Sequence, residues 1–285
     1  MMPAMDRQDS GVEAGAMLAS QRQQLIAEEV RRRGAVRVSE LTELLAVSDM
    51  TIRRDLDVLA SAGVLEKVHG GATARGAPST DEPGFEAKSH RQLDEKEAIA
   101  RKASALVEPG QAIACTAGTT NWRLVHHLVH VPDLTVVTNS IQVANVLHRD
   151  GRSDLTVVLT GGVRTPSDAL VGPVAVTALR SLHVDVLFMG VHGMSVDAGF
   201  TTPNLLEAET NQAMIASARR VVVVADHTKW GVRGLSRIAE LSAADTIVSD
   251  SRLSPQARTA IADQDIELIL APPGRPTRRT VISEG

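Results

Sequence analysis

The amino-acid sequence predicts two folds in one chain: a winged helix-turn-helix unit, then an α/β domain with a mostly parallel, Rossmann-like sheet. Three observations lead to this prediction. Short helical patterns and a candidate hairpin occupy the N-terminal quarter, a stretch rich in glycine, proline and acidic residues follows, and apolar strands alternate with helices from Gln111 onward. We expect a disordered tail at residues 1–19, the helix-turn-helix unit at 20–74, a linker at 75–90 and the α/β domain at 91–285.

Composition limits the class of protein. The 285 residues are 43% hydrophobic and 22% charged, and the formal net charge of −4 disfavours indiscriminate binding to nucleic acid. The single cysteine, Cys115, excludes an internal disulfide and a cysteine-based zinc cluster, and it fits a reducing cytoplasm. No apolar run approaches the roughly 20 residues that span a bilayer. We therefore expect a cytoplasmic protein without a membrane partner.

The first unit reads as three helices and a wing. Gln21–Arg33 is the first helix, Ser39 is the expected N-cap of a second at Glu40–Leu45, and Ser48 is the expected N-cap of a third that ends near Ala62. The stretch VLEKVHGGATA then predicts two strands joined by a glycine turn, which form a wing beside the third helix.

The third helix is the candidate DNA-reading element. Helical spacing places Ile52, Leu56 and Leu59 on one stripe and Arg54 opposite it. A recognition helix inserts its N-terminal half into the major groove, where the arginine fork matches the acceptors of guanine. The candidate DNA-binding residues on the helix and the wing are Ser48, Thr51, Arg53, Arg54, Lys67 and His69.

The competing interpretation is that paired arginines on an exposed helix are merely solvated, as arginine usually is. The adjacent wing argues against it. Residues 21–74 nevertheless contain eight basic and eight acidic residues, so the unit is not basic. We expect modest, salt-dependent affinity for double-stranded DNA and therefore binding as a homo-oligomer, either a dimer or a tetramer.

The second domain is predicted to begin with one long helix at Lys88–Val107. The near-continuous apolar character of the strands after it indicates a sheet that helices cover on both faces. The predicted strands are Ala112–Cys115, Thr135–Thr138, Leu155–Leu159, Val184–Met189, Arg220–Ala225, Thr246–Ser249 and Glu267–Leu270. The predicted helices are Trp122–Val129, Ile141–His148, Val174–Ser181, Leu205–Ser217 and Pro255–Asp263.

Polar residues and glycines gather where five of these strands end, which is where parallel α/β sheets bind ligands. A lysine with hydroxyl and backbone N–H donors suits a phosphate, whereas Glu207 and Asn139 suit sugar hydroxyls. Each motif alone has an ordinary structural explanation, since tight turns need glycine and most lysines are solvated. The candidate ligand-binding residues are Gly118, Thr119, Thr120, Asn139, Ser140, Gly161, Gly162, His192, Thr201, Thr202, Glu207 and Lys229. We expect no metal and no cofactor.

The stretch VSDMTIRRDLDVLASAGVLEKVHGGA, residues 47–72, closely resembles the N-terminal signature of DeoR-type bacterial transcriptional regulators, VS-x-x-TIRRDL followed by HGGA. The segments AGTT, LTVVTNS, LTGG, DVLFMGVHG, GFTTPNLLEAE and VVVVADHTKWG are similar, in order, to the effector domain of the same family. The resemblance covers about Gln21 to Ala271. It implies a winged helix that binds an operator and a sensor domain, related in fold to ribose-5-phosphate isomerase, that binds a phosphorylated sugar. Thr116 stands where the family often has Asp, and His192 stands where many members have Asp or another polar residue.

Two alternatives remain. The related isomerases carry a D-G-x-D segment and a nearby lysine, but here Met189, Gly190, Val191 and His192 occupy that segment, and methionine transfers no proton. An architectural DNA-binding protein would not need donors clustered at strand ends. We therefore expect a repressor of a carbohydrate operon that binds operator DNA and is released by a phosphorylated sugar, with an isomerase-like enzyme as the alternative.

Overall fold

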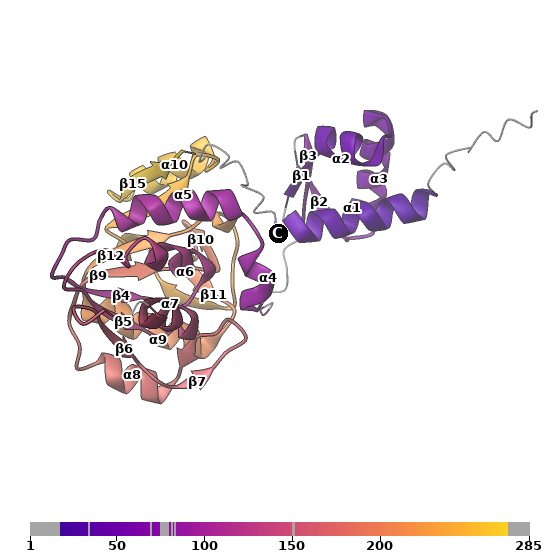
Figure 1. Ribbon diagram of the computed structural model, residues 1–285. Helices are drawn as coiled ribbons and strands as arrows, with labels where there is room; N and C mark the ends of the chain where they lie inside the picture. The colour runs from indigo at the N-terminus through magenta and orange to yellow at the C-terminus, as the bar shows by residue number, and fades with distance from the viewer. Residues whose placement is uncertain are drawn as a thin grey trace, which may run out of the picture. The chain divides into compact units, whose positions relative to one another are not determined.

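A computed structural model describes residues 18–272, except 34, 69, 75–79, 81, 83, 150 and 151. The chain separates into two compact units, residues 1–75 and 76–285 (Figure 1). The expected tail therefore lies almost entirely outside the described residues, and so does part of the expected linker. No helix in the described ranges has the length and apolar character that crossing a membrane requires.

The first unit is a winged helix-turn-helix. Three helices surround a small antiparallel sheet with strand order β1-β3-β2. Ile26, Leu41, Ile52, Leu56 and Leu65 are almost fully buried in its core. The elements are α1 (Ala19–Arg33), β1 (Ala35–Arg37), α2 (Val38–Leu45), α3 (Asp49–Ser61), β2 (Leu65–Val68) and β3 (Gly71–Ala74).

The start of α2 corrects one prediction. Ser39 is not the N-cap: the helix already begins at Val38, and the backbone N–H of Arg37 donates to the carboxylate of Glu40. Val38 is only 4% exposed, so the earlier start lets its side chain join the core. The three-residue strand β1, which pairs with β3, was not predicted because it is too short to show alternation.

The second unit contains a seven-stranded sheet in which every neighbouring pair is parallel, with strand order β15-β14-β12-β9-β4-β5-β6. Its strands are β4 (Ala112–Cys115), β5 (Thr135–Thr138), β6 (Thr156–Leu159), β9 (Val184–Met189), β12 (Ala218–Val224), β14 (Thr246–Asp250) and β15 (Glu267–Ala271). The predicted parallel α/β fold is confirmed, and all seven predicted strands are present.

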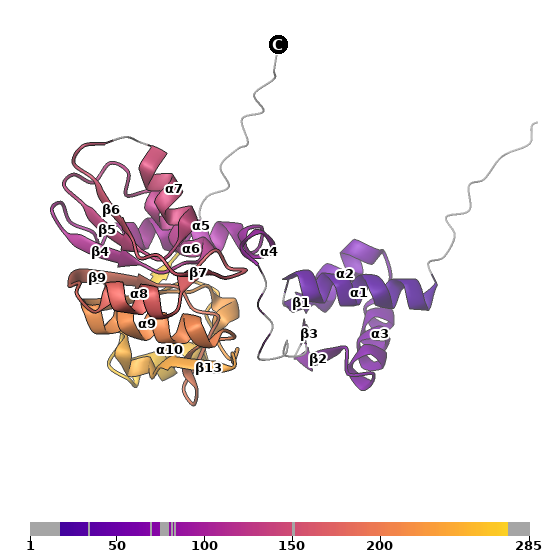
Figure 2. The same ribbon diagram turned by 90° about the horizontal axis from the view of Figure 1, so that it is seen from below.

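Helices cover both faces of this sheet (Figure 2). Because successive strand residues point to opposite faces, Val222 and Val224 pack in the core on one side and Val221 and Val223 in the core on the other. Helices α5 (Leu93–Ser104), α6 (Thr119–His126) and α7 (Ile141–Arg149) contribute to the first core. Helices α8 (Pro173–Leu179), α9 (Leu205–Ser217) and α10 (Pro255–Ala262) contribute to the second.

The prediction of one long helix at Lys88–Val107 is wrong. Two helices, α4 (Phe85–Ser89) and α5, occupy this region, and Gln92 between them adopts a left-handed conformation with φ of 52°. Short elements at the strand ends were also missed, because two to four residues give no readable period. They are β7 (Val163–Arg164), β8 (Leu170–Val171), β10 (Gly193–Ser195), β11 (Gly199–Thr202), β13 (Ser236–Ala239) and the 3₁₀ turns His227–Lys229 and Leu241–Ala243.

The strand order fixes where a ligand can bind. From β4 the chain adds β5 and β6 on one side, and then returns to add β9, β12, β14 and β15 on the other. The connections that leave β4 and β9 therefore run in opposite directions and open a crevice beyond their carboxyl ends.

Candidate functional sites

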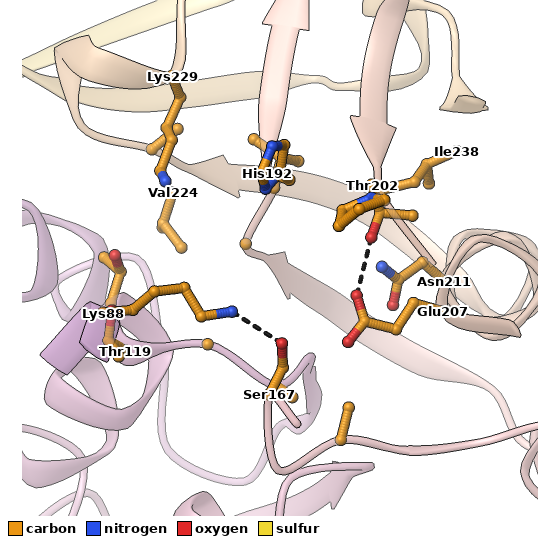
Figure 3. Close-up of a pocket in the computed structure, with 18 of the residues that line it drawn as sticks. Lys88, Thr119, Ser167, His192, Thr202, Glu207, Asn211, Val224, Lys229 and Ile238 are labelled. Atoms are coloured by element: carbon orange, nitrogen blue, oxygen red, sulfur yellow. Dashed lines mark hydrogen bonds between the residues drawn. The ribbon is translucent and has the colours of Figure 1, made fainter. Parts of the chain in front are cut away.

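A cleft that is open to solvent lies at this crevice. Its floor includes Ala117 and Gly118 after β4 and Gly190 and Val191 after β9. Figure 3 shows Lys88, Thr119 and Lys229 on one side and Glu207, Asn211 and Thr202 on the other. The cleft is thus divided into a cationic side and a side rich in oxygen acceptors.

The N-terminus of α6 opens onto the cationic side. Gly118, with φ of 151°, precedes the helix, and Thr119 and Thr120 form its first turn with side chains that are 6% and 7% exposed. The first N–H groups of a helix have no partner within the helix, and its dipole favours an anion at this end. The arrangement can hold a phosphate or a carboxylate.

Three lysines line the cleft, namely Lys88, Lys96 and Lys229. The Nζ of Lys88 donates to the hydroxyl of Ser167 at 2.8 Å, and the Nζ of Lys96 donates to the backbone carbonyl of Lys88 at 2.6 Å. Burial lowers the pKa of Lys96 to about 8, and the positive charge of Lys229 adds to this effect, while Asp226 opposes it. An anion bound among these ammonium groups would relieve their repulsion.

The turn that carries Lys229 is fixed by two buried aspartates. Asp226 accepts a hydrogen bond from the backbone N–H of Thr228, and Asp250 accepts one from the N–H of His227 at 2.7 Å. Burial lowers the pKa of His227, but its hydrogen bond and charge attraction to Asp250 outweigh burial and raise it overall. Lys229 therefore extends from a rigid base.

Glu207, near the start of α9, provides the main acceptor on the opposite side. Its carboxylate accepts from the hydroxyls of Thr202 at 2.8 Å and Thr165 at 3.2 Å. Burial raises the pKa of Glu207, partly offset by these hydrogen bonds and by the charge of Lys88. A carboxylate with remaining lone pairs can accept hydrogen bonds from ligand hydroxyls.

Eight of the twelve ligand-binding residues predicted from sequence line this one cleft: Gly118, Thr119, Thr120, Asn139, His192, Thr202, Glu207 and Lys229. Asn139 is used differently from the sequence prediction. Its carboxamide oxygen accepts from the N–H of Ala117 at 2.9 Å and its nitrogen donates to the carbonyl of Leu170. Asn139 therefore positions the loop after β4, whereas the sequence suggested that its side chain would bind sugar hydroxyls.

Ser140 and Thr201 do not line the cleft. The hydroxyl of Ser140 accepts from the N–H of Val143 in the first turn of α7. The hydroxyl of Thr201 accepts from the N–H of Gly234 at 2.9 Å and donates to the carbonyl of Gly193. Both hydroxyls therefore stabilise the fold.

Gly161 and Gly162 also lie outside the cleft lining. They turn the chain from β6 into β7 with φ of 73° and 123°. A Cβ on Gly162 would approach the backbone oxygen of Val171 to 2.5 Å. Glycine is required at position 162 because the neighbouring strand comes too close for a Cβ.

Sequence reasoning missed several residues of the cleft, among them Glu82, Lys88, Lys96, Ser167 and Asn211. One of them carried a readable signal. Lys96 lies three and four residues before Ile99 and Ala100, so it falls within the buried stripe of its helix, and it is only 4% exposed. A charged residue inside an apolar stripe indicates a site. No group of three or more potential metal ligands occurs within the described ranges.

The second candidate site is the exposed face of α3. Ile52, Leu56 and Leu59 are buried as predicted, whereas Arg54 is exposed and Met50 is 81% exposed. Ser48 is the N-cap: its hydroxyl accepts from the N–H of Thr51 at 3.3 Å and lies 2.8 Å from the Thr51 hydroxyl. Both hydroxyls thus stabilise the helix start, although they remain at its exposed N-terminal end.

Acidic residues on α3 neutralise part of its positive charge. Arg53 pairs with Asp49 on the same helix, and Lys67 on the wing pairs with Asp57, each at 2.5 Å. Asp55, on the same helix, is 3% exposed and paired with Arg22. His69 lies outside the described residues. Of the arginines that α3 contributes, Arg54 is thus the one for which the structure shows no carboxylate partner in the described part of the chain.

Comparison with known proteins identifies both units. The family model described as the DeoR-like helix-turn-helix domain matches residues 22–76, and the DeoR C-terminal sensor domain matches residues 91–251. The chain belongs to the DeoR family of transcriptional regulators. In this DeoR-family protein α3 is part of the helix-turn-helix domain, and the cleft is built largely from the sensor domain.

Relatives of this DeoR-family chain match it over nearly their whole length. The regulator YgbI of Escherichia coli K12 is 37% identical over 90% of this chain and 99% of its own. The glycerol-3-phosphate regulon repressor of the same strain is 31% identical, over 89% of this chain and 100% of its own. GlpR of Haloferax volcanii is 34% identical, over 89% and 98%.

Among solved structures, a ribose-5-phosphate isomerase in complex with phospho-erythronic acid covers 47% of this chain and 52% of its own, with 14% identity and a TM-score of 0.36. A likeness this small carries no argument about the cleft.

Proposed function

We propose that this regulator represses a carbohydrate operon and is released from operator DNA by a phosphorylated sugar that binds in the cleft. One observation supports the proposal most: the cleft places Lys88, Lys229 and the N-terminus of α6 on one side and Glu207 on the other. A sugar phosphate has the same two-ended chemistry, with a charged group at one end and hydroxyl donors at the other. One relative is a glycerol-3-phosphate regulon repressor, and glycerol 3-phosphate belongs to the same class of small phosphorylated polyols.

In this proposal the phosphate lies at Gly118–Thr120, where Lys229 and Lys96 neutralise it, and the hydroxyls of the sugar donate to Glu207. The cleft binds its ligand without turning it over. Met189, fully buried at the end of β9, cannot move a proton, and both oxygens of Glu207 accept threonine hydroxyls. The isomerase alternative would need an acid–base pair beside the substrate carbonyl.

The DNA-binding part of the proposal assigns operator readout to α3. Arg54 contacts base edges, while Arg53 and Lys67 exchange their carboxylate partners for phosphates. The first unit is charge-balanced, so the protein binds its operator as a homo-oligomer whose paired helices reach two half-sites.

The test is an operator-binding titration at low salt, using the upstream region of the protein's own gene and a scrambled duplex of equal length. Fructose 1-phosphate, fructose 6-phosphate, ribose 5-phosphate and glycerol 3-phosphate are added in turn. We expect preference for the upstream region and release by at least one compound. Lys229→Ala should keep operator binding but lose the response. Equal binding to both duplexes would refute operator readout, and turnover of any of these compounds would favour the enzyme.

A further inference from the structure

The cleft is completed by residues that precede the sensor domain. Glu82 and Lys88 line it, yet the helix-turn-helix match ends at residue 76 and the sensor-domain match begins at residue 91. We call Glu82 and residues 84–89 the strap. It lies near the start of the second unit and follows the residues that connect the two units in sequence.

The strap is held against the rest of the second unit by a few contacts. The N–H of Phe85 donates to the carbonyl of Pro166 at 3.1 Å, and its ring packs edge-on against Trp122 with centroids 5.9 Å apart. The ammonium of Lys96 donates to the carbonyl of Lys88. Lys96 therefore positions Lys88, whose side chain extends into the cleft (Figure 3).

A chain of hydrogen bonds connects Lys88 to the far side of the cleft. Its ammonium donates to the Ser167 hydroxyl, which donates to Glu82 at 3.3 Å, and Glu82 accepts from Asn204 at 3.0 Å. An ammonium has three donors, and among the described residues this one donates one hydrogen bond, to a neutral hydroxyl. Burial lowers the pKa of Lys88, and Glu207 opposes the shift. A half-buried cation that has donors left over favours an added anion.

The electrostatics place that anion close to the other lysines. Lys229 lowers the pKa of both Lys88 and Lys96, so all three ammonium groups lie within electrostatic range of one another. A phosphate at the N-terminus of α6 would be near this group. The hydrogen bond to Ser167 joins a cation to a neutral oxygen, whereas a phosphate would add the attraction between opposite charges. A phosphate would therefore compete effectively with Ser167 for the Lys88 ammonium.

We propose that Lys88 is a direct phosphate ligand and that the bound effector thereby fixes the strap to the strand ends of the sheet. This inference rests on the proposed function and adds the segment through which the effector acts. The coupling requires no new contact between the two units: the effector changes how firmly the chain is held immediately after the connection to the DNA-binding unit.

Hydrogen–deuterium exchange on the full-length protein tests where the effector acts. Exchange is measured with and without each of the four sugar phosphates named above, in peptides that contain the strap and in peptides that contain Gly118–Asn121. We expect slower exchange in both regions. Protection of the second region alone would overturn the role of the strap while leaving the proposed function intact. If no compound protects either region, the proposed function fails and this inference with it.

A pair of variants tests the Lys88 contact itself. Lys88→Met keeps the length of the side chain and removes its charge, and Lys102→Met does the same at an exposed position of α5. We expect Lys88→Met to weaken binding of the protecting sugar phosphate by about tenfold or more. Lys102→Met should bind as the wild type does.

The preference for the sugar phosphate over the unphosphorylated sugar distinguishes a residue that contacts the phosphate from one that only shapes the cleft. Lys88→Met should reduce the ratio between the affinities for the sugar phosphate and for the parent sugar, and Lys88→Arg should restore part of it. An unchanged ratio in Lys88→Met, with both affinities reduced equally, would show that Lys88 only shapes the cleft and would overturn the proposal.

Discussion

Lys96→Met gives a test that depends only on the structure of the second unit. Lys96 is 4% exposed, its ammonium donates a hydrogen bond to the carbonyl of Lys88, and burial lowers its pKa from about 10.5 to about 8. A difference of this size corresponds to about 3 kcal/mol of unfavourable free energy for keeping the charge in the folded state. The variant removes that cost.

The sign of the pH dependence follows from proton binding. Between about pH 8 and about pH 10.5 the unfolded chain keeps a proton on Lys96 that the folded chain has lost, so the free energy of unfolding of the wild type rises with pH. Lys96→Met has no such contribution. The stability of the variant relative to the wild type should therefore fall by up to about 3 kcal/mol between about pH 7 and about pH 10.

The absolute difference near neutral pH is smaller. Losing the hydrogen bond to the Lys88 carbonyl costs about 1–3 kcal/mol, which offsets most of the gain from removing the buried charge. We expect Lys96→Met to be between equally stable and about 2 kcal/mol more stable than the wild type at about pH 7. It should also lose the response to sugar phosphate.

Urea unfolding followed by tryptophan fluorescence measures this difference in the full chain. Both tryptophans, Trp122 and Trp230, belong to the second unit, so the signal reports on that unit alone. Lys102→Met is the matched control and should differ from the wild type by the same amount at every pH. A Lys96→Met difference that is equally flat from about pH 7 to about pH 10 would refute the assigned burial of the charge.

Two further predictions concern single residues. Arg54→Ala should reduce the preference for the operator over a scrambled duplex by about 1–3 kcal/mol and leave sugar-phosphate binding unchanged, as measured by gel shift and calorimetry, and an undiminished preference would place readout elsewhere. Gly162→Ala should lower the stability of the second unit by more than about 2 kcal/mol, because its Cβ would collide with Val171. Gly110→Ala is the comparison, since it also has a positive φ of 80° but nothing lies within 4 Å of its Cβ, and its cost should be about 1 kcal/mol. Equal losses in these two variants would mean that backbone conformation alone explains the glycine at 162.

Local patterns were sufficient to predict much of this molecule. Ser48 caps α3 because its hydroxyl satisfies an N–H only three residues away, and the bounds of β4, β5, β9 and α9 agree with those predicted from apolar runs and turn residues. Such features depend on interactions between near neighbours in the chain. The break at Gln92 was missed because nothing in the residues around it interrupts the helical pattern.

The sequence by itself thus determined the two folds, the family to which they belong and the edge of the sheet where a ligand can bind. Tertiary structure alone decided which polar groups are available at that edge. Asn139 and Thr201 are occupied by backbone partners, Gly162 is required by a neighbouring strand, and Lys88 meets Ser167 across 79 residues of chain. The physical reason is that neighbours in space decide how much of a side chain's hydrogen-bonding capacity is left for a ligand. Residues far apart in sequence become such neighbours only once the strand order is fixed.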